Sequence, residues 1–408
     1  MKLHLTPSIL CAVLIATATA CADTLRVSCY NALNLSGSSI IERRDDFRIV
    51  MESIDPDIAI FQEIVNEEAV DDLLSFAFLP VHDDWVAVTF HNGPYTDNAC
   101  FYRSSKVAFV SQRAIPTDLR DITEYTLEPH GLMGSTVFRL YSAHLKASQG
   151  TDNEERRRIE AEALRAQLDQ LAEGSLFAFG GDFNLYGASE PAYQVLLDDE
   201  NPNGQLFDPI NRYGEWHNSV SFADVHTQSP RGDFGGMDDR FDFILVSAAL
   251  MDTDRSHVIP ASYVAWGNDG QHFNQSINDG VNHMVSDEVA DALHDASDHL
   301  PVVADFVFVD ESSPVEPGGI APTNHRLLSC YPNPFNSTLT VEISSLPSVG
   351  TLTVTNLMGR AVQTLEVPAS PGAESSLRIP FHGQANGIYF VTLATQNVAV
   401  TQKVLFLK

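Results

Sequence analysis

The sequence of 408 residues is poor in basic side chains: 24 Lys and Arg residues stand against 54 Asp and Glu residues, a formal net charge of −30. Affinity for nucleic acids normally comes from Lys and Arg side chains that displace counterions from phosphates. The charge balance therefore excludes a protein that binds polyanions through its overall charge. Its simplest interpretation is a solubilising acidic surface, so that any phosphate-binding surface must be local.

The first 22 residues have the layout of a signal peptide. Lys2 precedes an apolar run over residues 9–16 and then small residues up to Ala22. We predict cleavage before Asp23, because a strand-like segment follows at once and leaves no tether for a lipid; a lipoprotein site at Cys21 is the alternative. No later run reaches about 18 apolar residues, so no transmembrane segment is expected after signal removal.

Cysteine is also scarce. Five are present, and two of them lie in the predicted signal peptide. The remaining Cys29, Cys100 and Cys330 are far apart and lack the spacing of metal ligands, which argues against a zinc site. Cys29 and Cys100 lie in strand-like segments and are predicted to be buried apolar residues.

The sequence does contain alternating strand-like and helix-like segments between residues 23 and 309, which predict an α/β (α+β) domain. Helices are predicted at 42–54, 67–76 and 154–173, with a short helix after its capping residue Ser286. Strands are predicted at 24–30, 58–61, 85–90, 99–103, 107–110, 135–144, 176–179, 240–247 and 301–309.

A composition change divides the chain near its C-terminal end. Residues 310–324 (DESSPVEPGGIAPTN) are rich in Pro, Gly and Ser, which is typical of a linker. Residues 325–408 have few helix signals and many short β-branched runs, which predict a small all-β sandwich.

Several predicted strands end at or near polar residues. Such positions matter because ligands bind outside the carboxyl ends of strands in open α/β sheets. Each residue alone is also typical of an ordinary turn, cap or salt bridge. In SLFAFGGDFN (175–184), a turn at Gly180 and Gly181 is predicted to present two of them. The candidates are Asn31, Glu63, His144, Asp182, Asn184, Asp298 and His299, with Asp242 inside a predicted strand.

Six motifs carry a resemblance to a known family. SCYN, FQE, SAHLKAS, GGDFN, RFDFIL and SDHLPV occur in the order and spacing of the endonuclease/exonuclease/phosphatase superfamily. This superfamily includes pancreatic-type DNases, apurinic-site endonucleases, neutral sphingomyelinases and inositol-polyphosphate phosphatases. The resemblance covers about residues 24–309 and implies a four-layer sandwich of two mixed β-sheets flanked by helices.

The metal site is expected at Glu63. A carboxylate at the end of a core strand is a hard oxygen ligand suited to Mg²⁺, with Mn²⁺ or Ca²⁺ as alternatives. Asn31 is expected to support the metal or its water, and Asp298 to assist the metal or water, with a capping role for Asp298 left open. The cation would neutralise a phosphate oxygen during an in-line displacement.

The catalytic roles follow from the remaining motif residues. Asp182 would orient or deprotonate the attacking water, and Asn184 would donate to a phosphoryl oxygen. His299 has a pKa suited to acid/base work, and by resemblance Asp242 hydrogen-bonds it. His144 matches DNases and sphingomyelinases rather than the apurinic-site enzymes, and would stabilise a phosphorane oxygen or protonate the leaving oxygen.

The C-terminal part carries a second resemblance. YPNPFN (331–336), LTVTNLMGRAV, NGIYFVTL and the closing KVLFLK resemble the sorting domain of type IX secretion substrates. The resemblance implies recognition by outer-membrane secretion machinery and a secreted or cell-surface protein. A generic adhesion-like β-domain is the alternative.

Together these features predict a secreted, divalent-metal-dependent phosphoesterase, with a phosphodiesterase acting on nucleic acid ahead of a monoesterase. The alternative enzyme is a sphingomyelinase-like phospholipase or a phosphomonoesterase. A non-catalytic surface-binding protein on the same scaffold is the alternative from another class; Glu63, Asp182, Asn184 and His299 argue against it, because loss of function usually removes such groups first.

Overall fold

The computed structural model describes residues 22–132 and 136–309 and, between residues 328 and 406, seven strands with parts of their connections. The described residues form two compact units, divided at about residue 314. Residues 1–21 of the predicted signal peptide and the whole predicted linker lie outside the described residues, as do residues 332–334 and 336 of YPNPFN.

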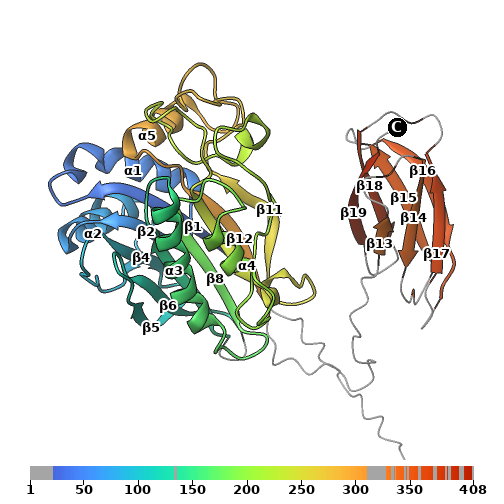
Figure 1. Ribbon diagram of the computed structural model, residues 1–408, viewed down its shortest axis with the longest axis horizontal. Helices are drawn as coiled ribbons and strands as arrows, with labels where there is room; N and C mark the ends of the chain where they lie inside the picture. Colours follow the sequence, from blue (N-terminus) through green and yellow to red (C-terminus); the bar gives the residue numbers. More distant parts are fainter. Residues whose placement is uncertain are drawn as a thin grey trace, which may run out of the picture. The chain divides into compact units, whose positions relative to one another are not determined.

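Two mixed six-stranded sheets form the centre of the larger unit (Figure 1). In each sheet one neighbouring pair is parallel, β1 with β2 in the first and β7 with β8 in the second. The first sheet, in spatial order, consists of β11 His257–Ala265, β12 Val302–Val309, β1 Ala22–Leu35, β2 Ile58–Ile64, β4 Asp97–Arg103 and β3 Trp85–Ala87. The second consists of β5 Val107–Ile115, β6 Ile122–Pro129, β7 Phe138–His144, β8 Leu176–Asp182, β10 Asp242–Ser247 and β9 Leu206–Phe207.

Helices cover the outer face of each sheet, which gives the four layers predicted from the sequence (Figure 1). One core joins α1, α2 and α5 to the first sheet, another joins α3 and α4 to the second, and a third fills the space between the sheets. None of the helices described is long and apolar enough to span a bilayer. The helices are α1 Ile40–Ile54, α2 Glu67–Leu73, η1 Leu74–Phe78, α3 Thr151–Leu168, α4 Pro191–Leu197, η2 Val220–Val225, η3 Ala248–Met251 and α5 Asp287–Ala296.

Strand β8 shows why its sequence is a continuous apolar run. Leu176 and Ala178 point into the core between the sheets, whereas Phe177 and Phe179 pack under the helices. A strand covered on both faces needs apolar residues at every position, because successive side chains point to opposite faces. Cys29 and Cys100 belong to the same inter-sheet core as free, fully buried residues, as predicted.

The structure corrects several local predictions. The predicted turn at Gly180 is wrong, because β8 continues through both glycines to Asp182. Helix α3 ends at Leu168 rather than at the predicted Glu173. Beyond Leu168 the helical hydrogen bonds give way to a tight turn, in which the Leu171 amide donates to the Leu168 carbonyl. Asp242 opens its strand instead of lying inside it. Ser286 caps α5 as predicted, since its side chain accepts from the Val289 amide.

The smaller unit is all-β, as predicted. Alternate apolar residues of its strands, such as Leu339, Val341 and Ile343 of β14, form one core. A three-stranded sheet contains β13 Leu328–Tyr331, β14 Thr338–Ile343 and β17 Ser375–Pro380. A four-stranded sheet contains β16 Ala361–Val367, β15 Gly350–Asn356, β18 Gly387–Ala394 and β19 Ala399–Phe406.

The two glycines of β8 differ in whether their surroundings leave room for a side chain. At Gly181, φ is +153°, and an added Cβ would lie 1.9 Å from the Ala143 carbonyl oxygen of the neighbouring strand. At Gly180 the nearest atom to an added Cβ is the Cδ1 end of the Ile60 side chain, at 2.9 Å. Only Gly181 is therefore required by backbone packing.

We expect Gly181→Ala to lower the free energy of unfolding by about 3 kcal/mol or more, because the new methyl group meets backbone that cannot rotate away. Gly180→Ala is the matched control, and its effect should stay within about 1 kcal/mol because Ile60 can change rotamer. Urea unfolding followed by circular dichroism measures both. Equal, small effects would show that the close approach at Gly181 does not constrain this strand.

Candidate active site

Three candidate residues lie side by side on neighbouring strands of the second sheet. His144 ends β7 and pairs in register with Asp182, the last residue of β8. Asp182 pairs in turn with Asp242, the first residue of the antiparallel strand β10. The parallel and antiparallel pairings thus bring two strand ends and one strand start to the same edge of the sheet.

The first sheet supplies Asn31 and Glu63 to the same place. Asn31 lies on β1 opposite Gln62 of β2, and the pairing is interrupted immediately afterwards. Glu63 has φ of +61°, a conformation that non-glycine residues rarely adopt and that often marks functional positions. The Asn34 amide donates to its Oε2 atom at 2.7 Å, which fixes the carboxylate at the strand end.

Asn31 joins the two sheets through its side chain. Its Nδ2 atom donates to Asp182 Oδ2 at 2.9 Å and to Glu63 Oε1 at 3.0 Å. Its Oδ1 atom accepts from the Leu33 amide at 3.0 Å. The amide therefore holds two carboxylates from different sheets next to each other.

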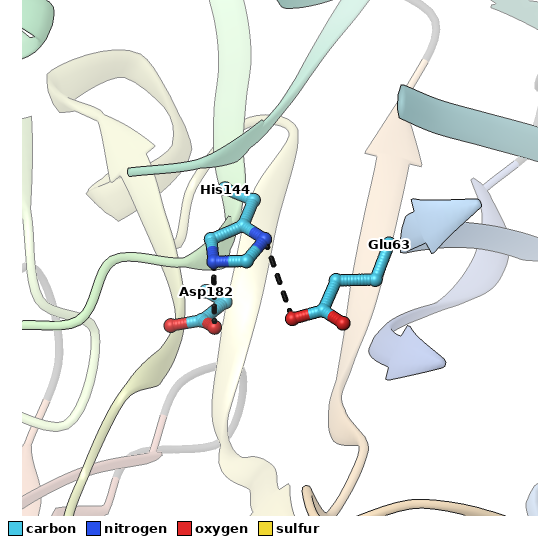
Figure 2. Close-up of side chains that lie close together, drawn as sticks. All are labelled: Glu63, His144 and Asp182. Carbon is cyan, nitrogen blue, oxygen red and sulfur yellow. Dashed lines mark ion pairs between the residues drawn. The ribbon is translucent and has the colours of Figure 1, made fainter. Parts of the chain in front are cut away.

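The His144 ring lies between the same two carboxylates (Figure 2). Its Nδ1 atom is 3.5 Å from Glu63 Oε1 and its Nε2 atom is 3.5 Å from Asp182 Oδ2. Burial lowers the pKa of His144 well below its ordinary value, and the nearby charges of Arg120, His299 and Lys146 lower it further. The ring is accordingly neutral, and its buried Nδ1 atom has no hydrogen-bond partner among the described residues.

His299 has the opposite character. Burial alone would lower its pKa, but the carboxylates of Asp242 and Asp182 raise the pKa of His299 well above its ordinary value. Its Nδ1 atom donates to Asp242 Oδ2 at 2.7 Å, and its Nε2 atom lies 3.7 Å from Asp182 Oδ2. The site therefore contains one neutral and one protonated imidazole on either side of Asp182.

Asp182 lies at the centre of this arrangement. Burial, with Asp242 and Glu63 nearby, raises the pKa of Asp182 to about 7, although His299 and the Asn31 hydrogen bond oppose the rise. The cluster holds more buried negative charge than its single imidazolium balances. This imbalance disfavours the fully ionised state unless another positive charge is present.

A divalent cation fits this donor set. One ligand atom each from Glu63, His144 and Asp182 lie within 4.8 Å of one another. Carboxylate oxygens suit Mg²⁺ or Mn²⁺, so the Glu63 and Asp182 side chains are the members of this group that fit these ions. Asp298, buried just before His299, lies outside this group.

Asn184 is held by backbone beside Asp182. Its amide nitrogen donates to Asp182 Oδ1 at 3.0 Å, and its side-chain Nδ2 atom donates to the Leu145 carbonyl at 3.3 Å. Its φ of +51° is again left-handed. The second Nδ2 hydrogen remains for another acceptor.

The structure adds residues that the sequence analysis did not assign. Gln62 donates to Ser142 Oγ at 2.9 Å and so links the sheets beneath the site. The Thr227 hydroxyl accepts from the Asp242 amide, and the Ser297 hydroxyl donates to the Asn31 carbonyl while accepting from the His299 amide. A polar Gln62 inside the apolar run DIAIFQEI was the one visible signal; the hydroxyl contacts depend on tertiary structure.

We expect the two histidines to titrate on opposite sides of the ordinary histidine pKa in cation-free protein. The imidazolium of His299 should persist above neutral pH and that of His144 should be lost well below it. Asp242→Asn should lower the pKa of His299, because it removes the negative charge that favours the imidazolium. Two-dimensional NMR of the ring protons measures both titrations. Titration of both rings together near pH 6.5 would contradict the geometry.

Comparison with known proteins identifies two families in the chain. Residues 30–299 match the Endonuclease/Exonuclease/phosphatase family, and residues 329–407 match the Secretion system C-terminal sorting domain, which implies export to the cell surface or secretion. No curated protein sequence matches the chain.

Several solved structures have a similar course of the chain. An endonuclease/exonuclease/phosphatase family protein from Bacteroides thetaiotaomicron is 16% identical, with 75% of this chain and 100% of that chain covered and a TM-score of 0.48. A D. rerio TDP2 humanised by 14 mutations is 15% identical, with 69% and 98% covered and a TM-score of 0.46. The human Nocturnin catalytic domain with bound sulfate is 19% identical, with 70% and 97% covered and a TM-score of 0.45.

The family match spans about two thirds of the chain and includes the residues that meet at the edges of the two sheets, from Asn31 to His299. The chain therefore belongs to the Endonuclease/Exonuclease/phosphatase family, whose members are hydrolases of phosphoester bonds, and it carries a C-terminal secretion sorting domain.

Proposed function

We propose that the protein is a secreted, divalent-metal-dependent phosphodiesterase that hydrolyses nucleic acid by in-line attack of water. The observation that carries the proposal is the position of Asp182. It lies 3.7 Å from the protonated His299 ring and shares a hydrogen-bond donor with Glu63. A base, an acid and a cation ligand thus surround one point, which hydrolysis of a phosphoester requires.

Glu63 would hold the cation, with Asp182 as the adjoining carboxylate and Asn31 fixing both. Asp298 would assist from the segment before β12. When bound, a divalent cation supplies charge neutralisation at a phosphate oxygen. Mg²⁺ is the first candidate because it prefers carboxylate oxygen ligands, and Mn²⁺ or Ca²⁺ are alternatives.

The protein's own side chains divide the remaining work. Asp182 orients the attacking water and accepts its proton. The imidazolium of His299, held by Asp242 through Nδ1, would give its Nε2 proton to the leaving oxygen. Asn184 donates its free amide hydrogen to a phosphoryl oxygen, and the neutral ring of His144 stabilises a phosphorane oxygen rather than supplying a proton.

Local positive charge supports a polyanionic substrate. Desolvation and the nearby charges of Arg156 and Arg120 lower the pKa of Lys146, which shows that the three basic side chains lie close together. The charges of Arg120 and Lys146 also lower the pKa of His144, so the group lies close to the candidate active site. None of the three forms an ion pair with a carboxylate of the described residues, in contrast to Arg158 on the same helix as Arg156. This group, termed the basic cluster, could bind a phosphate that flanks the scissile one.

Secretion would follow from the two ends of the chain. The signal peptide predicted over residues 1–22 would export the protein from the cytoplasm. The domain at residues 325–408 would then be recognised by the outer-membrane secretion machinery, and the catalytic domain would be residues 23–309.

The proposal predicts that the full chain with Mg²⁺ hydrolyses plasmid DNA or RNA, and does so faster than sphingomyelin or a phosphomonoester. His299→Ala should lower the rate by about 10²–10⁴-fold, because it removes the acid. Gel and phosphate-release assays measure the rates. Hydrolysis of none of the four substrates with several metals would favour a non-catalytic scaffold, and lipid cleavage alone would favour the phospholipase alternative.

Two arginines of α3 provide the matched test of nucleic acid as substrate. Arg156→Gln should raise KM for DNA. It should also reduce the slope of log KM against log salt concentration by about 0.7–0.9, which is the contribution of one phosphate contact. Arg158→Gln should change neither, because Arg158 is already paired with Glu155 and Glu162. Equal behaviour of the two variants would show that the basic cluster does not bind the strand.

A further inference from the structure

A second group of potential metal ligands lies beside the candidate active site. One atom each from His217, Asp238 and Asp239 lie within 4.8 Å of one another. His217 stands in the segment before η2, and the two aspartates immediately precede Arg240 and β10. We term these three residues the rim cluster; its ligand atoms are distinct from those of Glu63, His144 and Asp182.

The rim cluster combines buried carboxylates with an accessible ring. Asp238 and Asp239 are 8% and 6% exposed, whereas the His217 side chain is 41% exposed. His217 Nδ1 lies 2.6 Å from Asp239 Oδ1, and the Gln149 amide lies 3.1 Å from the other ring nitrogen. A ligand could therefore enter past the imidazole from solvent.

The Asp238 carboxylate is the unusual member. Among the described residues its own backbone amide donates to it and the His217 ring is the nearest positive group, and the residue as a whole is 8% exposed. The carboxylate of Asp239 stands beside it, and two neighbouring negative charges repel each other unless a cation lies between them. Burial raises the pKa of Asp238, and burial and Asp238 together raise the pKa of Asp239 to about 6 despite the opposing effect of His217.

We propose that His217, Asp238 and Asp239 bind a second divalent cation at the rim of the active site. The donor set is one imidazole nitrogen and two carboxylate oxygens. Such a mixed set suits Mn²⁺ or Zn²⁺ better than Mg²⁺ or Ca²⁺, which prefer oxygen ligands alone. Three protein ligands at a solvent-facing position leave room for water or for a ligand of the cation.

The position of the rim cluster gives the cation a role if the proposed function holds. The Tyr186 ring contacts both His217 and Phe241, with ring centroids 5.2 Å and 4.9 Å apart, and Phe241 lies 6.4 Å from the His299 ring. The backbone of Asp239 pairs with Gln228, whose side chain lies 3.1 Å from His299. Without a cation the two carboxylates repel a phosphate-bearing substrate; with one, this rim attracts it.

Manganese binding to the full chain tests the site without using activity. After chelator treatment, Mn²⁺ titration followed by electron paramagnetic resonance and calorimetry should give one rim cation per chain in the Glu63→Ala variant. Adding Asp238→Asn to this variant should abolish the binding or weaken it at least tenfold.

Adding His217→Ala instead should have the same effect. The His217 side chain is 41% exposed, so its removal leaves the core intact. The control is His82→Ala, which removes a ring 2.7 Å from a single carboxylate, Asp55, and should leave binding unchanged.

Retention of rim binding in folded Asp238→Asn and His217→Ala chains would overturn the proposal, as would a loss no larger than that of His82→Ala. Absence of any Mn²⁺ in the Glu63→Ala chain would overturn it as well. The same titrations report on the Glu63 site separately. The single variant Asp238→Asn should lose the rim cation and keep the cation at Glu63. Failure of the proposed hydrolysis is thereby distinguished from failure of the rim site.

Discussion

The hydrogen bonds of Asn31 to Asp182 and Glu63 are the constraint on which the site depends. The bond to Asp182 joins a strand of the first sheet to a strand of the second, and the bond to Glu63 ties the neighbouring strand of the first sheet to the same amide. Beneath them, Gln62 and Ser142 make a second bond between the sheets. With both sheets fixed, strand pairing places His144, Asp182 and Asp242 side by side.

The same geometry creates a local excess of buried negative charge. Burial and neighbouring carboxylates raise the pKa of Asp182 to about 7, and Asp238 and Asp239 form a second pair of adjacent carboxylates nearby. Both clusters lie in a chain of net charge −30. Basic side chains elsewhere in the chain therefore do little to stabilise these carboxylates, because charges at that distance are screened. We infer that divalent cations and the basic cluster, rather than the overall charge, make the candidate active site suitable for phosphate.

The residues that meet could be picked out because their motifs stand at the ends of apolar runs such as LFAF, whereas the four layers were implied by the family resemblance of those motifs. The sequence did not predict that Gly181 lies within its strand, since the contact requiring glycine comes from Ala143 of another strand. It also missed β11, whose pairing with β12 is interrupted between Ile259 and Val264 and whose burial does not alternate regularly. Thr227 and Ser297 act on Asp242 and His299 through contacts that exist only in the folded chain.

Mg²⁺ calorimetry on the full chain tests the central claim, that the carboxylates held by Asn31 form a cation site for phosphoester hydrolysis. We predict that Glu63→Ala abolishes or strongly weakens Mg²⁺ binding, because an oxygen ligand is lost. His144→Ala should leave binding nearly unchanged, because its ring serves the phosphoryl group. Undiminished Mg²⁺ binding by a folded Glu63→Ala chain would contradict the account, and an equal loss in both variants would contradict the role given to His144.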